Sequence, residues 1–263
     1  MSVDERHQQI LALVKGSGYL AIDGLAKHFQ VTPQTIRRDL NRLAEDGRLV
    51  RHHGGASIQS SVRNTRYEQR RTDRAREKAA IAQRLAQWLP DGCSLFLSLG
   101  TTTLALAHAL RIRKGLKVIT NSLEAAQALL VHPDTEVILL GGRLEGRNLG
   151  VSGTITVAAL DQYRVDACLF SVGGIDQDGS LLEYHEGEVA VVRAMMQRAR
   201  QSVLVIDHSK FGRTAAVRLG AITEVSAIVT DQALPPNLAR LLRRSAVELL
   251  IANDTAPRSK LTR

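Results

Sequence analysis

From Glu77 onward, short apolar segments alternate with longer amphipathic ones, and this alternation constrains the fold more than any other feature of the sequence. Short aliphatic runs predict buried strands, and longer segments with apolar residues at helical spacing predict helices. We predict strands at 95–97, 118–119, 137–140, 167–172, 203–206 and 227–229, and helices at 79–89, 101–110, 123–131, 188–200 and 238–243. Strands that alternate with helices favour an α/β domain with a largely parallel sheet, which we expect over residues 77–253.

The composition excludes several classes of protein. Of the 263 residues, 44% are hydrophobic and 23% are charged, which rules out a disordered chain. The two cysteines, Cys93 and Cys168, are too few for a disulfide scaffold or a cysteine-based zinc site. No apolar stretch approaches the roughly 20 residues that span a bilayer, and residues 1–15 do not resemble a signal peptide. We therefore expect a cytoplasmic protein with no metal, no cofactor and no membrane partner.

Positive charge is concentrated near the N-terminus. The net charge is +9, and residues 1–76 carry 14 Lys and Arg against 8 Asp and Glu. This asymmetry favours a nucleic-acid-binding module, although a solvated basic surface would explain the charge alone equally well. Residues 58–76 hold several arginines and few aliphatic side chains, so we interpret them as a basic linker. The polar residues 254–263 are expected to be a frayed tail.

Residues 1–57 have the pattern of three short helices followed by a hairpin. Apolar spacing predicts a first helix over 6–15, ended by Gly16 and Gly18, and a second helix around 25–29. A third helix follows Thr32, because Thr32 can cap it and the next residue, a proline, fits the first helical position. We expect it to end near Asp46, before Gly47. A short strand at 49–50 and a glycine turn at 54–55 come next.

The third helix has two chemically different faces. Ile36, Leu40 and Leu43 lie on one face at about 100° per residue and predict burial. Gln, Arg and Asn residues point the other way, and these side chains can bind base edges and phosphates. An ordinary amphipathic helix also has a polar face, but here two short helices precede a basic one across a tight turn. The expected DNA contacts are Thr32, Gln34, Thr35, Arg37, Arg38, Asn41 and Arg42, with phosphate contacts from Arg51, His52 and His53. Adjacent positions on a strand face opposite ways, so the two histidines do not predict a metal site.

Small and polar residues follow five of the predicted strands. In α/β sheets, ligands bind beyond the carboxyl ends of the strands. The first of these loops joins a strand directly to a helix N-terminus, where amides and Thr hydroxyls can surround a phosphate; a plain capped turn has the same sequence pattern. These loops favour an anionic polar ligand over an apolar one. The expected ligand contacts are Gly100, Thr101, Thr102, Thr103, Asn121, Ser122, Gly141, Gly142, Gly174, Asp176, Glu188, Asp207 and Lys210.

Motifs in both halves of the chain resemble those of one family. Residues 31–47, with Thr35-Ile-Arg-Arg-Asp39 at their centre, and Arg51-His-His-Gly-Gly-Ala56 resemble the winged helix-turn-helix of DeoR-type bacterial transcriptional regulators. The second half is similar to the effector domain of that family in the segments Gly100-Thr-Thr, Thr120-Asn-Ser, Gly141-Gly142, Gly174-Ile-Asp176, Glu188 and Asp207-His-Ser-Lys-Phe-Gly212.

The resemblance implies a fold and a ligand. It implies a winged helix whose third helix enters the major groove, and an α/β effector domain similar to ribose-5-phosphate isomerase and CoA transferases. It further implies a phosphorylated sugar or polyol as effector, and likeness to one branch of the family implies glycerol 3-phosphate. Two positions depart from the family pattern: Ser98 stands where an Asp is usual, and residues 184–192 carry fewer basic side chains. Both lie near the inferred pocket and bear on which ligand it takes.

Three functions are compatible with these features. We favour a repressor without enzymatic activity that binds double-stranded operator DNA as a homodimer or homotetramer and responds to a phosphorylated effector; regulation of another sugar-phosphate pathway is the nearest alternative. A sugar-phosphate isomerase with a basic N-terminal extension would use Asp176, Glu188 or Asp207 as its base. A non-specific nucleic-acid binder would account for the charge but not for the polar strand ends.

Overall fold

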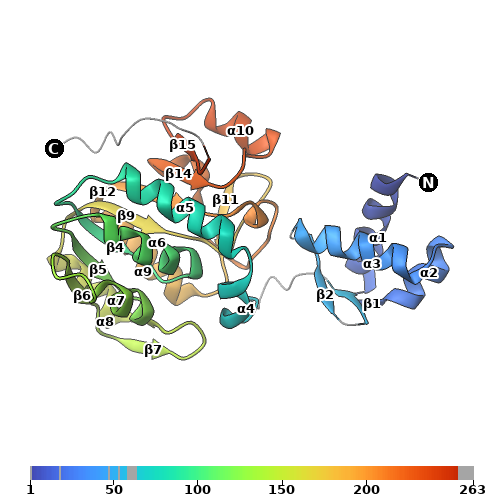
Figure 1. Ribbon diagram of the computed structural model, residues 1–263, viewed down its shortest axis with the longest axis horizontal. Helices are drawn as coiled ribbons and strands as arrows, with labels where there is room; N and C mark the ends of the chain where they lie inside the picture. The colour runs from blue at the N-terminus through green and yellow to red at the C-terminus, as the bar shows by residue number, and fades with distance from the viewer. Residues whose placement is uncertain (1, 18, 47, 53, 58–63, 254–263) are drawn as a thin grey trace.

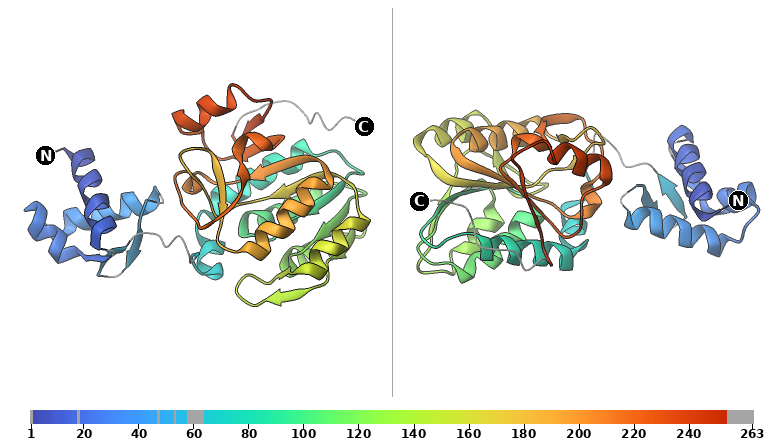
Figure 2. Two further views of the ribbon diagram at one scale, coloured as in Figure 1. Left: turned by 180° about the vertical axis from the view of Figure 1, so that it is seen from behind. Right: turned by 90° about the horizontal axis from the view of Figure 1, so that it is seen from above.

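The protein has two modules, each with its own hydrophobic core (Figure 1). The computed structural model describes residues 2–17, 19–46, 48–52, 54–57 and 64–253. The expectations for Gly18, Gly47, His53 and the segments 58–63 and 254–263 lie outside these residues. Two further views show the smaller N-terminal module beside the larger C-terminal one (Figure 2).

The N-terminal module combines three helices with a small antiparallel sheet. Its elements are α1 (Val3–Ser17), β1 (Tyr19–Ala21), α2 (Ile22–Phe29), α3 (Pro33–Glu45), β2 (Val50–His52) and β3 (Gly55–Ser57), with the strands in the order β1-β3-β2. Ile36, Leu40 and Leu43 of α3 are fully buried, as predicted. The expectation that Gly16 ends the first helix is wrong, because α1 continues to Ser17. The three helices and the hairpin confirm the winged helix-turn-helix.

The C-terminal module is built on a seven-stranded sheet in the order β15-β14-β12-β9-β4-β5-β6, with every neighbouring pair parallel. Its strands are β4 (Ser94–Leu97), β5 (Lys117–Thr120), β6 (Glu136–Leu139), β9 (Val165–Phe170), β12 (Ala199–Val205), β14 (Ala227–Thr230) and β15 (Glu248–Ile251). All six predicted strands belong to it, which confirms the parallel α/β domain. β15, at one edge of the sheet, was not predicted.

Helices cover both faces of this sheet. They are α5 (Ala75–Trp88), α6 (Thr101–Ala109) and α7 (Leu123–Leu129) on one face, and α8 (Thr154–Ala159), α9 (Glu186–Gln197) and α10 (Pro236–Leu242) on the other. Successive strand residues alternate between the two cores: Leu95 and Leu97 pack with α5–α7, and Phe96 packs on the opposite side. Residues 199–200, predicted as the end of a helix, instead begin β12.

Two smaller strand groups complete the C-terminal module. β10 (Gly174–Ile175), β11 (Ser180–Glu183) and β13 (Val217–Ala221) form an antiparallel sheet, and β7 (Arg143–Glu145) pairs with β8 (Gly150–Ser152). Short 3-10 turns occur at Leu110–Ile112, Leu160–Gln162, His208–Lys210 and Ile222–Glu224. These segments lack long apolar runs, so the sequence pattern did not reveal them.

The segment expected to be a linker is partly helical. α4 (Tyr67–Thr72) lies within it, and α5 begins at Ala75, before the start expected at residue 79. Tyr67 is buried, and its hydroxyl donates a hydrogen bond to Glu124 at the start of α7. Two of the arginines that suggested a linker, Arg70 and Arg71, therefore lie on a short helix that packs against the C-terminal module.

The described residues offer neither a membrane span nor a metal site. No helix among them is long and apolar enough to cross a bilayer. No group of three or more His, Cys, Asp or Glu side chains in this part of the chain is arranged to hold a metal ion. Cys93 and Cys168 are both buried thiols.

Candidate functional site

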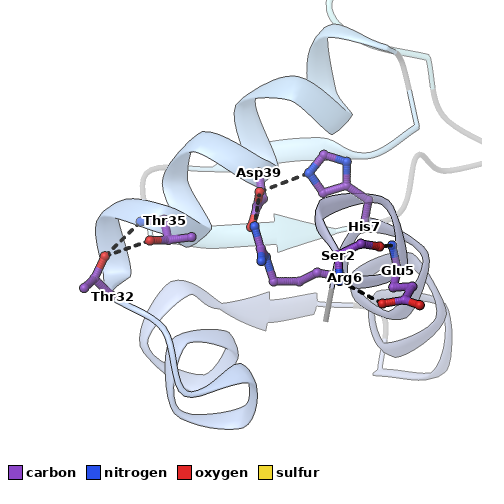
Figure 3. Close-up of polar contacts among 7 residues, drawn as sticks. All are labelled: Ser2, Glu5, Arg6, His7, Thr32, Thr35 and Asp39. Atoms are coloured by element: carbon purple, nitrogen blue, oxygen red, sulfur yellow. Dashed lines mark hydrogen bonds and ion pairs between the residues drawn. The ribbon is translucent and has the colours of Figure 1, made fainter.

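Helix α3 presents its predicted polar face to solvent. Thr32 caps the helix: its Oγ1 accepts a hydrogen bond from the Thr35 amide at 3.1 Å and lies 2.9 Å from the Thr35 hydroxyl (Figure 3). These two hydroxyls therefore cap the N-terminus of α3. The exposed residues on this helix include Gln34, Arg37, Arg38, Asn41 and Arg42. Together they form a polar and basic surface, which we call the α3 face.

A buried ionic group holds α3 against α1. The Asp39 carboxylate accepts hydrogen bonds from Arg6 Nε at 2.6 Å and Arg6 Nη2 at 3.1 Å, and it lies 3.0 Å from His7 Nε2 (Figure 3). Burial opposes ionisation, but the contacts with Arg6 and His7 outweigh it and hold the pKa of Asp39 below its usual value. Asp39 lies in the motif that carried the family resemblance, yet its role was not predicted. Its partners are more than thirty residues away in the sequence.

The hairpin after α3 forms the wing. Arg51 lies on β2 and is exposed, and His52 lies on the same strand. Gly55 follows the turn, where a Cβ atom would come within 2.2 Å of the Leu20 carbonyl oxygen. A glycine is therefore needed for β3 to approach β1 this closely. Arg51 on this hairpin lines the same surface pocket as Asn41 of the α3 face.

The topology brings the five predicted loops to one edge of the large sheet. β4, β5, β6, β9 and β12 are parallel, so the loops after them all leave the carboxyl edge. The strand order reverses at β4: β5 and β6 extend the sheet to one side, and β9, β12 and β14 extend it to the other. Ligands in such sheets bind in the crevice at this reversal point.

The loop after β4 adopts a conformation that favours glycine. Gly100 precedes α6 with φ of 148°, and its carbonyl oxygen accepts a hydrogen bond from the Thr103 hydroxyl at 3.0 Å. Thr102 and Thr103 are buried, whereas Thr101 is half-buried. The Thr103 hydroxyl is thus used within the helix end, while the first amides of α6 face the carboxyl edge.

Asn121 links three segments at this edge. Its Oδ1 accepts a hydrogen bond from the Leu99 amide, and its Nδ2 donates one to the Val151 carbonyl oxygen, both at 3.0 Å. Ser122 caps α7 by accepting a hydrogen bond from the Ala125 amide at 3.2 Å. Both side chains therefore organise the loops after β4 and β5.

Several predicted ligand residues have roles in packing or turns. Gly142 has φ of 144°, and a Cβ atom there would lie 2.1 Å from Thr156 Oγ1; Thr156 also donates a hydrogen bond to the Gly141 carbonyl oxygen. At Gly174, a Cβ atom would lie 2.1 Å from the Arg213 carbonyl oxygen. Asp176 lies in the turn between β10 and β11, where its carboxylate accepts the Gln177 amide at 2.7 Å.

The remaining predicted residues belong to a cluster of charged side chains. Asp207 and Lys210 are buried in the loop after β12, and Glu188 lies in the first turn of α9. Electrostatic interactions connect these three with further charged groups. We call six of these residues the charge cluster: Arg70, Glu183, Glu188, Asp207, Lys210 and Arg213.

Hydrogen bonds fix most members of the charge cluster. Arg213 Nε donates to the Tyr184 hydroxyl at 2.9 Å, and Arg213 Nη2 donates to Asn64 Oδ1 at 2.9 Å. Glu188 accepts from Asn148 Nδ2 at 2.5 Å. Asp207 accepts from the Ser209 amide at 3.1 Å and from the Ser209 hydroxyl.

Burial favours the neutral forms of the charged side chains in this cluster and shifts the pKa values of Glu183, Glu188 and Lys210 accordingly. Burial and repulsion from Arg213 lower the pKa of Lys210 to about 7. Burial and repulsion from Glu183 raise the pKa of Glu188 to about 7, and burial raises that of Glu183. Burial also opposes the charge of Asp207, but Lys210 and Ser209 outweigh it and lower the pKa of Asp207. The pKa values of Lys210 and Glu188 therefore lie close to each other, at about 7.

A small pocket at the carboxyl edge adjoins the charge cluster. Glu183 and Glu188 contribute its carboxylates, while Leu99 and Asn121 come from the loops after β4 and β5. The remaining lining residues are Ser171, Val189, Val192 and Leu219. The pocket therefore lies where the strand order of the sheet reverses, and the two carboxylates of the charge cluster line it.

Both modules match known domains. Residues 6–62 match the DeoR-like helix-turn-helix domain, and residues 73–232 match the DeoR C terminal sensor domain. The chain belongs to the DeoR family. As in the sequence-based expectation, the DeoR-type helix-turn-helix precedes an α/β sensor domain.

Two relatives that cover nearly the whole chain are named as repressors. The chain is 43% identical to the glycerol-3-phosphate regulon repressor of Escherichia coli, over 95% of this chain and 99% of the relative. It is 41% identical to the HTH-type transcriptional repressor CsqR of E. coli, over 95% of this chain and 96% of the relative. Among solved structures it is similar to ribose 5-phosphate isomerase A of Methanocaldococcus jannaschii, with a TM-score of 0.40 and 16% identity, covering 53% and 55% of the two chains.

Sequence reasoning missed part of the charge cluster of this DeoR-family chain. The sequence pattern places Arg70 in the linker and gives Glu183 and Arg213 no role in the site. Arg70 lies on α4, Glu183 ends β11, and Arg213 follows the turn after β12. A signal was present for Arg213, because it directly follows the segment 207–212, which resembles the family. No local pattern shows that Arg70 joins them.

Proposed function

We propose that this DeoR-family protein is a transcriptional repressor that releases its operator when it binds glycerol 3-phosphate. The chain is similar to two repressors with different names, and this similarity supports repression. The choice of effector rests instead on the residues of the candidate site. The charge cluster beside the pocket is the observation that supports a phosphorylated polyol as effector. Its cations can bind a phosphate group, and its carboxylates can accept hydrogen bonds from hydroxyl groups.

The cationic side of the charge cluster suits the phosphate group. Arg70, Lys210 and Arg213 gather near the loop after β12, and Lys210 is buried. A phosphate binds most strongly where several charged donors converge in a poorly solvated site. The N-terminus of α6, after Gly100, adds amide donors at the carboxyl edge of the same sheet. We infer that Lys210 is the main charged contact and that the amides of residues 100–103 contribute.

The acidic side suits the hydroxyl groups. Glu183 and Glu188 line the pocket with Asn121 and Ser171. Carboxylates accept hydrogen bonds from hydroxyl groups but repel a second anion. A small polyol with a single phosphate therefore matches the pocket better than a phosphorylated acid. Among the three-carbon compounds of this kind, glycerol 3-phosphate is the effector that we propose.

The DNA contacts follow from the α3 face and the wing. We propose that Gln34, Arg38 and Asn41 contact base edges, and that Arg37, Arg42 and Arg51 contact phosphates. The proposed contacts also include Thr32 and Thr35 at the helix start, together with His52 and His53, which the sequence predicts for the wing. A symmetric homodimer or homotetramer would place two such modules on successive major grooves.

Operator release by the effector is the central test. A duplex is selected from a random library by the purified protein, and its affinity is measured by fluorescence anisotropy with and without glycerol 3-phosphate. We expect the effector to weaken binding at least about fivefold, at the lower end of common allosteric couplings. Glycerol and inorganic phosphate serve as controls. Ribose 5-phosphate is tested in the same series, and we expect no aldose–ketose conversion.

Calorimetry tests the site separately. Glycerol 3-phosphate is titrated into the wild-type protein and into Lys210→Ala, and we expect the variant to bind at least about tenfold more weakly because it loses a charged donor. Equal affinities would remove Lys210 from the site. Absence of binding by any phosphorylated three- to six-carbon compound would remove the site itself. Binding without operator release would show that the domain is not a sensor.

A further inference from the structure

Residues 64–74 contact both the charge cluster and the DNA-binding module. This segment, which we call the α4 segment, contains α4 and its two flanks. It follows residues 58–63 and leads directly into α5 at Ala75. In the views of Figures 1 and 2, α4 lies on the side of the effector module nearest the N-terminal module.

The first flank of the α4 segment is held by the charge cluster. Arg213 Nη2 donates to Asn64 Oδ1 at 2.9 Å, while Arg70 Nε donates to the Thr65 carbonyl oxygen at 3.1 Å. Arg70 also interacts electrostatically with Glu183 and Glu188, the carboxylates of the pocket. The guanidinium groups of Arg213 and Arg70 thus bind the first flank of the α4 segment and also belong to the charge cluster at the candidate effector site.

The second flank reaches the DNA-binding helix. Arg74 Nη2 donates a hydrogen bond to the Glu45 carbonyl oxygen, and Glu45 is the last residue of α3. Arg74 adopts a left-handed conformation with φ of 54°, which turns the chain between α4 and α5. Asn41 and Arg51 of the DNA-binding module line the same surface pocket as Arg74 and Arg213. The contact therefore lies at the end of α3, next to residues of the proposed DNA interface.

The body of the α4 segment is tied to the effector module on a second side. The Tyr67 hydroxyl donates to Glu124, and Arg71 Nη1 lies 3.2 Å from the other oxygen of that carboxylate. Lys78 of α5 donates from Nζ to the carbonyl oxygens of Arg70 and, at 2.6 Å, Asp73. The Lys78 contacts join α4 and the start of α5 into one unit, so a displacement of the first flank is carried to Arg74 at the second flank.

We propose that Arg213 and Arg74 are positioning residues that couple the effector site to α3 through the α4 segment. The proposal rests on the proposed function. An anionic group bound at Lys210 competes for the guanidinium groups of Arg213 and Arg70 and draws them away from Asn64 and Thr65. The first flank is then no longer held, and Arg74 loses its contact with the end of α3. The effector therefore has a higher affinity for the arrangement in which Arg74 does not contact the end of α3. A difference in affinity between two arrangements is what couples the two sites.

The test separates coupling from binding. Arg74→Asn removes the long side chain and keeps a residue type that tolerates the left-handed conformation. Effector affinity is measured by calorimetry, and operator affinity by anisotropy with and without saturating glycerol 3-phosphate. We expect the variant to keep effector affinity within twofold of wild type, while the effect of the effector on operator affinity falls at least about fivefold. Arg74→Lys, which retains a donor for the Glu45 carbonyl oxygen, is expected to restore most of the coupling.

A matched control and a second variant complete the test. Arg76→Ala removes one exposed positive charge two residues further on and is expected to leave the coupling unchanged. Asn64→Ala acts at the opposite flank and is expected to weaken the coupling as well. If the wild type responds to the effector and both Arg74→Asn and Asn64→Ala respond equally well, the coupling role is wrong. If the wild type itself does not respond, the proposed function fails instead.

Discussion

The arginines of the two modules differ in their surroundings, and the difference separates their roles. On α3, Arg37, Arg38 and Arg42 are exposed to solvent. In the effector module, Arg213 is buried against Tyr184 and Arg70 faces two carboxylates. Exposed cations can approach the phosphates of DNA with little desolvation and are screened by salt. Buried cations already have partners, so an anion must displace those partners in order to bind.

The buried ionic groups of the two modules also differ from each other. In the N-terminal module, Asp39 is saturated by Arg6 and His7 and holds two helices together. In the effector module, the charge cluster borders a pocket, and two of its members have pKa values near 7. A buried charge whose hydrogen bonds are all made within the protein contributes to stability. A buried group whose pKa is near 7 can change its charge when a ligand binds.

The largest expected effect is on the stability of the N-terminal module. Asp39→Ala leaves the Arg6 charge without its partner in a poorly solvated position, and breaking such a pair costs about 3–5 kcal/mol. We expect the loss to appear as faster hydrogen exchange of the α3 amides in the full chain. Asp46→Ala removes an exposed carboxylate at the end of the same helix and should change the protection by less than about 0.5 kcal/mol. Equal protection in both variants would contradict a structural role for Asp39.

The next effect concerns the exposed arginines of α3. Arg38→Ala is expected to weaken specific operator binding by about 1–3 kcal/mol while leaving the thermal unfolding of both modules unchanged, because the side chain is exposed. Footprinting titrations measure the affinity, and Arg76→Ala on α5 provides the matched control. Wild-type operator affinity in the Arg38 variant would remove this residue from the base contacts.

The pH dependence of effector binding tests the buried side of the comparison. Lys210 and Glu188 both titrate with a pKa of about 7, so raising the pH removes a positive charge and adds a negative one. The phosphate of the effector is already a dianion in this range, since its second pKa is about 6. We expect the Kd for glycerol 3-phosphate to rise above pH 7, by up to about tenfold per pH unit for each group.

Calorimetry between pH 7 and 8.5 measures this slope. Lys210→Arg keeps its charge over the whole range and is expected to show a shallower dependence. Operator binding by the exposed arginines of α3 should change little over the same range, because arginine does not deprotonate there. A flat pH profile for wild-type effector binding would show that neither Lys210 nor Glu188 changes charge at the site.

The smallest effect is expected at the wing. Arg51→Ala should weaken binding to specific and random duplexes alike and should lower the slope of log affinity against log salt by about one unit. Anisotropy titrations at several salt concentrations provide this slope. A variant that alters base preference while retaining the wild-type slope would make Arg51 a base contact instead.

Local patterns were enough to predict the elements that carry the most regular periodicity. Ile36, Leu40 and Leu43 at helical spacing predicted the buried side of α3, and Thr32 followed by proline predicted its start. The apolar runs predicted six parallel strands, and from their direction it followed that the loops after them share one edge. These features depend on residues that lie within a few positions of each other in the sequence, which is why they could be predicted from it.

The sequence by itself determined the two modules, the polar face of α3 and the edge of the sheet at which we propose that the effector binds. Only the tertiary structure decided which charged residues meet there. Arg70 comes from a supposed linker, Glu183 from a short strand in a separate sheet, and Arg213 from the loop after β12. Asp39 likewise finds its partners on α1. The physical reason is that periodicity reports whether a side chain is buried, whereas the partner of a buried charge depends on contacts between segments far apart in the chain.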